Sequence, residues 1–268
     1  MRCGISTACF YPQETLESLK VIASAGVRVT EIFLNTFSEL EDIYIARLLD
    51  VVKEHGMEVS SVHPFTSALD GFFFASHYPS RFNDGAQLYR RYFTAAHAFG
   101  ADKLVFHGDN AAMADKFDCE RYAENFRHLS EIGHEFGVML CHENVSYCRL
   151  KDARAVQVLR PLFGKAAAFV LDTKQARRAA EPVEDILKAM SGAVQTVHIS
   201  DYDANSACVA PGAGKFDFSG FFTKLRRQRY DGDIIIELYR DGFESVSDLL
   251  ASMNYLSTFM GQENLVKC

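Results

Sequence analysis

The sequence lacks the features that mark several large classes of protein. None of its seven cysteines forms a Cys-x-x-Cys pair, so we expect reduced thiols and neither a disulfide framework nor a structural zinc site. No apolar run reaches the roughly 18 residues of a spanning helix, and no opening segment resembles a signal peptide. These absences predict a soluble, cytoplasmic protein with no membrane partner. The cysteines are Cys3, Cys9, Cys119, Cys141, Cys148, Cys208 and Cys268.

The sequence also has fewer basic residues than acidic ones. Lysine and arginine number 28 against 35 acidic residues, a formal net charge of -7. Phosphate backbones bind basic surfaces, so this balance argues against a nucleic-acid partner. Paired arginines at Arg90-Arg91, Arg177-Arg178 and Arg226-Arg227 lie in helix-like stretches, and we interpret them as solvated helix faces. The expected partner is a small molecule, and a homo-oligomer is compatible with the composition.

One unit recurs along the chain: a helix-like stretch, a glycine and then an apolar run. The glycine of each unit is expected to close the preceding helix with a positive φ; these are Gly26, Gly56, Gly100, Gly137, Gly164, Gly192 and Gly232. The apolar runs predict eight strands, at Cys3–Ala8, Val29–Leu34, Glu58–Val62, Lys103–Phe106, Val138–His142, Ala168–Leu171, Val194–Ile199 and Asp233–Glu237.

Eight such alternations in 268 residues, 48% of them hydrophobic, predict an α/β fold: a single (β/α)₈ TIM-barrel domain over residues 1–268. Nearly continuous apolar strands are typical of a parallel sheet covered by helices. An open doubly wound sheet is the second interpretation, which the absence of Gly-x-Gly-x-x-Gly after the first strand disfavours.

Seven of the eight predicted strands end on or near a carboxylate or an imidazole. These residues are Glu31, His63, His107, Glu143, Asp172, His198 and Glu237. Barrel enzymes carry their sites at the carboxyl ends of the strands, so we expect these side chains to meet at one mouth.

The last four of these residues predict a metal site. Glu143, Asp172, His198 and Glu237 come from consecutive strands, and three buried carboxylates would repel one another without a cation. This oxygen-rich set suits one divalent ion, Mn²⁺, Mg²⁺ or Co²⁺, with Zn²⁺ as a further candidate. Glu143 and Glu237 approach from different sides, so one could remove a proton from a substrate carbon and the other return it. Whether these glutamates are bases, ligands or both is left open at this stage.

Two long loops are predicted to overhang the mouth, Pro64–Gly85 and Asp201–Phe218. Loops of this length are often lids or binding loops. The first is rich in aromatic residues, which could form either a small satellite core or a wall for substrate.

Several short motifs accompany the strand ends. They are Ser61-Val-His-Pro-Phe65, Val105-Phe-His107, His142-Glu-Asn-Val145, Leu171-Asp-Thr173, Val197-His-Ile-Ser-Asp201, Pro211-Gly-Ala-Gly214 and Ile236-Glu237. Through them essentially the whole chain resembles the xylose isomerase-like barrels, the sugar phosphate isomerase/epimerase superfamily that also contains endonuclease IV. The resemblance implies metal ligands at Glu143, Asp172, His198 and Glu237, with Glu143 and Glu237 as the proton-transfer pair.

The chain departs from the ketose 3-epimerases of this superfamily at three positions. Gln175 stands where they have histidine, Arg149 where they have a second glutamate, and Ala204 where they have arginine. Arg149 and Gln175 are therefore predicted to contact substrate. An arginine there, with Lys174 beside Gln175, would fit an anionic sugar phosphate or sugar acid. The other interpretation is that Arg149 and Lys174 point to solvent.

The endonuclease branch, which uses three zinc ions, fits less well. His63 and His107 match ligands of a further metal, but Gln175 replaces a histidine ligand and Cys208 another. His63 and His107 are therefore predicted to bind substrate hydroxyls, or a weakly held second ion.

These features together predict a metal-dependent isomerase or epimerase of carbohydrate metabolism. It would act on a sugar, sugar phosphate or related polyol, by proton transfer at the carbon beside an oxygen that the metal polarises. The alternatives are a polyol dehydratase of the same superfamily, an AP endonuclease-like phosphodiesterase and a non-catalytic sugar-binding barrel.

Overall fold

The computed structural model describes residues 1–110 and 117–261, and these form a closed barrel of eight parallel strands in sequence order. Strand β1 pairs with β8 as well as with β2, with Ile5 opposite Ile236, so the sheet has no edge. This confirms the predicted (β/α)₈ barrel and excludes the open sheet. The strands are β1 (Arg2–Ser6), β2 (Val29–Leu34), β3 (Glu58–Pro64), β4 (Lys103–Phe106), β5 (Met139–Glu143), β6 (Phe169–Asp172), β7 (Val194–Ile199) and β8 (Asp233–Ile236).

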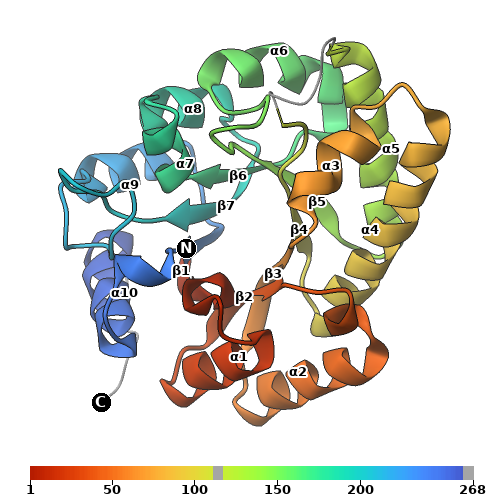
Figure 1. Ribbon diagram of the computed structural model, residues 1–268. Coiled ribbons are helices and arrows are strands. Elements are labelled where there is room, and N and C mark those ends of the chain that lie inside the picture. The colour runs from red at the N-terminus through yellow and green to blue at the C-terminus, as the bar shows by residue number, and fades with distance from the viewer. Residues whose placement is uncertain (111–116, 262–268) are drawn as a thin grey trace.

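Helices surround the barrel as an outer ring (Figure 1). They are α1 (Thr15–Ser24), α2 (Asp42–Glu54), α3 (Ser67–Phe74), α4 (Pro79–Phe99), α5 (Cys119–Glu135), α6 (Ala153–Phe163), α7 (Thr173–Arg178), α8 (Val183–Ala189), α9 (Phe218–Arg227) and α10 (Val246–Met260). Short 3₁₀ turns are η1 (Thr7–Phe10), η2 (Ser38–Leu40), η3 (Gly164–Ala166) and η4 (Arg240–Gly242). Among the described residues, no helix combines the length and the apolar character that crossing a membrane requires.

Strand alternation divides the apolar residues between two cores. Leu104 and Phe106 belong to the large core, which includes the buried faces of the helices. Val105, Cys141 and Val170 form a separate small cluster, which we assign to the barrel interior. Because successive strand side chains point to opposite faces, His107, Glu143 and Asp172 share the inner face of their strands with these three residues.

The first strand is shorter than predicted. It ends at Ser6 because the next four residues, Thr7–Phe10, form η1, and the Ser6 side chain caps this turn by accepting a hydrogen bond from the Ala8 amide. Such a cap satisfies an amide that would otherwise lack a partner, which ends the strand pairing at this point.

Six of the seven predicted glycines adopt a positive φ, and Gly232 does not. After α9 the left-handed position is taken by Arg229, with a φ of 58°. Gly232 serves a different purpose, because a Cβ at this position would lie 2.5 Å from the backbone oxygen of Gln195. A glycine is needed here because two chain segments approach closely. In the sequence, such a glycine looks the same as one that ends a helix.

The segment 64–85 is not a long loop, so that prediction is wrong. It contains α3 and the first turns of α4, with Pro79 at the first position of the helix. Phe74 is fully buried against Tyr89 and Phe106, so it belongs to the core. Phe65, by contrast, lines a cavity at the barrel mouth.

The second predicted loop, between β7 and α9, is held together by one carboxylate. Asp201 accepts hydrogen bonds from the backbone amides of Tyr202, Gly212, Gly214 and Phe216, at 2.8–3.1 Å. A Cβ on Gly214 would lie 2.2 Å from the Tyr202 carbonyl oxygen. The Pro-Gly-Ala-Gly motif therefore lets the backbone wrap closely around Asp201.

Candidate metal centre at the barrel mouth

Four side chains from consecutive strands converge at the carboxyl ends of β5 to β8. Glu143, Asp172, His198 and Glu237 are all buried, and each offers one ligand atom within 4.8 Å of the others. Glu143 and Asp172 are the last residues of their strands, and Glu237 follows directly after β8. The fold thus brings the four predicted ligands together at one point.

His198 is the centre of this group. Its Nδ1 lies 3.0 Å from both Glu143 Oε1 and Glu237 Oε2. Its Nε2 lies 2.9 Å from Oε2 of Glu31, at the other side of the ring. An imidazole that donates one N–H to a carboxylate presents the opposite nitrogen to a metal, so Glu31 fixes the ring with Nδ1 facing the other carboxylates.

Glu31 is itself fully buried on β2 and supported by hydroxyls. Ser61 donates to its Oε2 at 2.6 Å and Ser6 to its Oε1 at 3.1 Å. Burial would raise the pKa of Glu31, but the positive charge of His198 outweighs it and lowers that pKa below the usual value. Burial would likewise lower the pKa of His198, whereas Glu31 and Glu237 hold it well above its usual value.

Asp172 provides a direct test of whether a cation fits. Its Oδ1 caps α7 by accepting from the Gln175 amide at 2.8 Å. Its Oδ2 is buried and accepts no hydrogen bond from the described residues, with the Lys174 ammonium 3.4 Å away. Burial, together with repulsion from Glu143 and Glu237, raises the pKa of Asp172 to about 8 in spite of nearby Lys174. A buried oxygen that accepts no hydrogen bond, beside two more carboxylates and an imidazole, is suited to a divalent ion.

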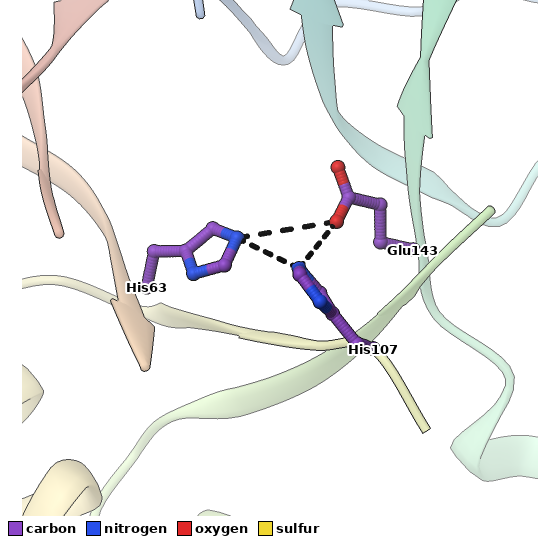
Figure 2. Close-up of side chains that lie close together, drawn as sticks. All are labelled: His63, His107 and Glu143. Atoms are coloured by element: carbon purple, nitrogen blue, oxygen red, sulfur yellow. Dashed lines mark hydrogen bonds and ion pairs between the residues drawn. The ribbon is translucent and has the colours of Figure 1, made fainter. Parts of the chain in front are cut away.

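A second cluster shares Glu143 with the first. Figure 2 shows His63 and His107 pointing toward Glu143. The Nε2 of His107 lies 2.8 Å from Glu143 Oε2 and 3.0 Å from His63 Nε2, and the His63 nitrogen lies 3.9 Å from the same carboxylate oxygen. These three residues could also hold an ion.

The two histidines of this cluster are electrostatically unequal. Burial, with repulsion from His107, lowers the pKa of His63 to about 4. Burial opposes charge on His107 as well, but Glu143 raises the pKa of His107. Burial would raise the pKa of Glu143, and the charge and hydrogen bond of His107 help to hold it well below its usual value. The neutral form is therefore favoured at His63, whereas the charge of Glu143 favours the protonated form of His107.

The two remaining predicted residues lie near the centre but are engaged with other groups. Arg149 Nε donates to Asp109 Oδ2 at 2.9 Å, and its guanidinium lies 4.7 Å from the centre of the Phe117 ring. The Gln175 Oε1 accepts from the Ser146 amide at 3.1 Å and from its hydroxyl at 2.8 Å. Gln175 thus ties α7 to the segment that follows β5.

Lys174 is buried among the carboxylates of the site, a position that the sequence did not reveal. Its Nζ lies 3.1 Å from Glu237 Oε2 and 3.4 Å from Asp172 Oδ2, and only 3% of the residue is exposed. It therefore does not point to solvent, which corrects one of the two interpretations of this residue. Burial would lower its pKa, but Asp172 and Glu237 hold the pKa well above the usual value.

A cavity of about 420 Å³ opens beside these residues. Lys174 and Glu237 lie in its wall, and much of the rest is made by Tyr11, Phe33, Asn35, Phe65 and Tyr239. Apolar and aromatic walls with a few polar groups are typical of sites for small molecules. The cavity thus joins Glu237 to a space large enough for a small ligand.

Comparison with known proteins identifies the fold family of the chain. The model of the family described as xylose isomerase-like TIM barrel matches residues 19–259. None of the curated proteins matches the sequence.

Solved structures of sugar epimerases share the fold. A D-tagatose 3-epimerase-like protein superposes with a TM-score of 0.79 at 18% identity, over 97% of both chains. The D-psicose 3-epimerase of Clostridium cellulolyticum H10, solved with D-tagatose, has a TM-score of 0.77 at 15% identity, over 97% of this chain and 99% of that one. The 3-keto-D-glucoside 4-epimerase of E. coli has a TM-score of 0.74 at 18% identity, over 96% and 99%.

Proposed function

The chain belongs to the xylose isomerase-like TIM barrel family, and from this premise we propose that it is a metal-dependent sugar isomerase or epimerase. The substrate would be a sugar, a sugar phosphate or a related polyol. The observation that carries the proposal is the buried group in which Glu143 and Glu237 both lie 3.0 Å from His198 Nδ1. Structures of similar fold named as a D-tagatose 3-epimerase-like protein, a D-psicose 3-epimerase and a 3-keto-D-glucoside 4-epimerase support the reaction class.

A divalent ion held by Glu143, Asp172, His198 and Glu237 would supply Lewis-acid polarisation of a carbonyl or hydroxyl oxygen of the substrate. His198 is positioned for this by Glu31, and Asp172 is fixed by Asn144, whose side chain bonds the Asp172 backbone amide at 2.7 Å and its carbonyl at 3.0 Å. The choice among Mn²⁺, Mg²⁺, Co²⁺ and Zn²⁺ is left to measurement.

Glu143 and Glu237 are the proposed proton carriers. One would take a proton from a substrate carbon and the other would return a proton to the opposite face. Each has a cationic neighbour that stabilises its ionised form, His107 for Glu143 at 2.8 Å and Lys174 for Glu237 at 3.1 Å. A cationic neighbour keeps each carboxylate in the deprotonated form that a base requires, lowers its basicity, and favours release of the proton afterwards.

His63, His107, Arg149 and Gln175 are proposed to bind substrate. His63 and His107 lie beside the shared carboxylate, where they could donate to hydroxyl groups or hold a second ion weakly. Arg149 and Gln175 would act from the segment after β5 and from α7.

An AP endonuclease-like phosphodiesterase is the second candidate, favoured by the His63, His107 and Glu143 cluster. Against it stand Gln175, which is a poor metal ligand and is bonded to Ser146, and the net charge of -7. Retardation of abasic duplex DNA at low salt, with zinc loaded, would favour this candidate. A polyol dehydratase would use the same residues and would be recognised by loss of water from its substrate.

Proton exchange with solvent tests the main proposal. The protein loaded with Mn²⁺ is incubated with D-tagatose, D-psicose, D-fructose 6-phosphate or D-fructuronate in D₂O, and deuterium at the carbon next to the carbonyl is followed by NMR. A general base contributes about 10²–10⁴-fold, so Glu237→Gln should slow exchange by at least about 100-fold. Glu244→Gln changes an exposed glutamate beyond the same strand and serves as the matched control. Equal exchange in Glu237→Gln and wild type would refute the role of Glu237, and a barrel that only binds sugars would exchange nothing.

A further inference from the structure

Lys174 is a buried cation that pairs with two of the four candidate metal ligands. Its Nζ lies 3.1 Å from Glu237 Oε2 and 3.4 Å from Asp172 Oδ2. A buried ammonium is tolerated when carboxylates compensate its charge. Asp172 and Glu237 provide that compensation for Lys174.

A bound ion would compete with Lys174 for Asp172 and Glu237, because both carboxylates belong to the proposed ligand set. A divalent ion neutralises two of the three negative charges of its carboxylate ligands, and it also repels an ammonium nearby. The Tyr239 ring, whose centre lies 4.9 Å from Nζ, offers a cation–π contact. That contact is weaker than an ion pair with a free carboxylate. Ion binding therefore weakens the pairing of Lys174 with Asp172 and Glu237, and leaves its ammonium able to pair with a further anion.

The cavity is the place from which such a partner can come. Lys174 is the one cationic side chain among the described residues that line it, and Glu237 is the one carboxylate. Arg149 does not line this cavity and donates to Asp109 instead. An anionic group entering the cavity would thus meet Lys174 as its charged partner.

We propose that Lys174 is the anion-recognition residue of this cavity, and that the substrate is a sugar carrying a carboxylate or a phosphate. The proposal rests on the proposed function, because the bound ion is what frees Lys174. It names a substrate class that a site lined by neutral hydroxyl-binding groups would not select.

The first measurement concerns the ion alone. Because the ammonium and the ion compete for Asp172 and Glu237, Lys174→Met should bind Mn²⁺ at least about tenfold more tightly than wild type in calorimetric titration of chelator-treated protein. Lys174→Gln, which is uncharged and polar, guards against poor folding of the methionine variant. Lys215→Met removes an exposed lysine from the loop after β7, outside the cavity, and should leave the affinity unchanged.

The second measurement concerns the ligand. D-Fructose, D-fructose 6-phosphate and D-fructuronate are titrated into the full chain saturated with Mn²⁺, and heats from Mn²⁺ without protein are subtracted. One charged compound should bind about 10- to 100-fold more tightly than fructose, as a charge-assisted contact provides. The phosphate and carboxylate arms distinguish the two forms of the anion. The preference should fall to near unity in Lys174→Met and persist in Lys215→Met.

The proposal is overturned if both charged compounds bind wild type no better than fructose, and also if the preference survives Lys174→Met. Unchanged Mn²⁺ affinity in that variant contradicts the competition on which the proposal depends. These readouts are equilibrium bindings, whereas failure of the proposed reaction would appear as absent deuterium exchange, so the two failures are told apart.

Discussion

Replacing Glu31 by glutamine removes one charge from behind His198 and changes little else. Glu31 accepts from His198 Nε2 at 2.9 Å, from Ser61 at 2.6 Å and from Ser6 at 3.1 Å. A glutamine can place its oxygen toward His198 and Ser61 and its amide toward the Ser6 hydroxyl, which can accept. All three contacts therefore survive, and the variant isolates the effect of the carboxylate charge.

The expected magnitude follows from the change in one hydrogen bond. A bond to a charged group is worth about 1.5–3 kcal/mol and a neutral one about 0.5–1.5 kcal/mol, so about 1–1.5 kcal/mol is lost. That corresponds to about tenfold in affinity, at the lower end of the 10–100-fold range that is typical when the carboxylate behind a metal-bound histidine is removed. Glu31→Gln should therefore weaken Mn²⁺ binding by at least about tenfold.

Calorimetric titration of Mn²⁺ into chelator-treated protein measures this loss. Asp233→Asn is the control, because Asp233 is a buried carboxylate at the opposite end of the barrel, paired with Arg2 at 2.8 Å. This control should lower stability without changing the affinity for the ion. If the affinity of Glu31→Gln for Mn²⁺ is within twofold of that of wild type, then Glu31 does not support His198 as a metal ligand.

Two further predictions concern the backbone around the site. Asp201→Asn should speed amide hydrogen exchange in residues 212–216, because one oxygen that accepts their amides is lost. The control is Asp203→Asn, a half-buried residue of the same loop whose carboxylate accepts the amides of Asn205 and Ser206 instead; equal protection of residues 212–216 in the two variants would contradict the prediction. Gly108→Ala should cost about 2–4 kcal/mol in urea unfolding, since φ is +78° and the new Cβ would lie 2.0 Å from the Tyr122 hydroxyl. Gly26→Ala is its control, with a φ of +80° but open space around the Cβ, and a loss no larger than that of Gly26→Ala would refute the steric argument.

The fold could be predicted from sequence because its signals are local. An apolar run of four to seven residues after a helix-closing glycine is visible in one window, and the ends of β2, β4 and β7 fall at the predicted residues. The errors are also local. Ser6 begins a 3₁₀ turn, Arg229 replaces a glycine at a positive φ, and α3 with α4 occupies a stretch whose aromatic residues concealed its helical period.

The candidate site could be predicted only as far as its ligands lie at strand ends. The partners of those ligands are set by contacts between distant parts of the chain. Glu31 is 167 residues from His198 and Lys174 is 63 residues from Glu237. Nothing in the sequence around Lys174 shows that this lysine is buried, because its burial depends on the position of β8 across the mouth.

Lys174 also changes how the departures from the ketose 3-epimerases should be understood. The sequence suggests that Arg149 and Lys174 could act together on an anion, but Arg149 is paired with Asp109 while Lys174 lies in the cavity wall beside Glu237. The histidine of the related epimerases is replaced by Gln175, whose side chain bonds Ser146. The positive charge is carried instead by Lys174, the residue that precedes Gln175. The position before Gln175 on α7 thus places a cation, Lys174, beside Glu237, the carboxylate that we propose as a proton carrier. The same ion pair therefore influences both the preference for a charged substrate and the basicity of Glu237.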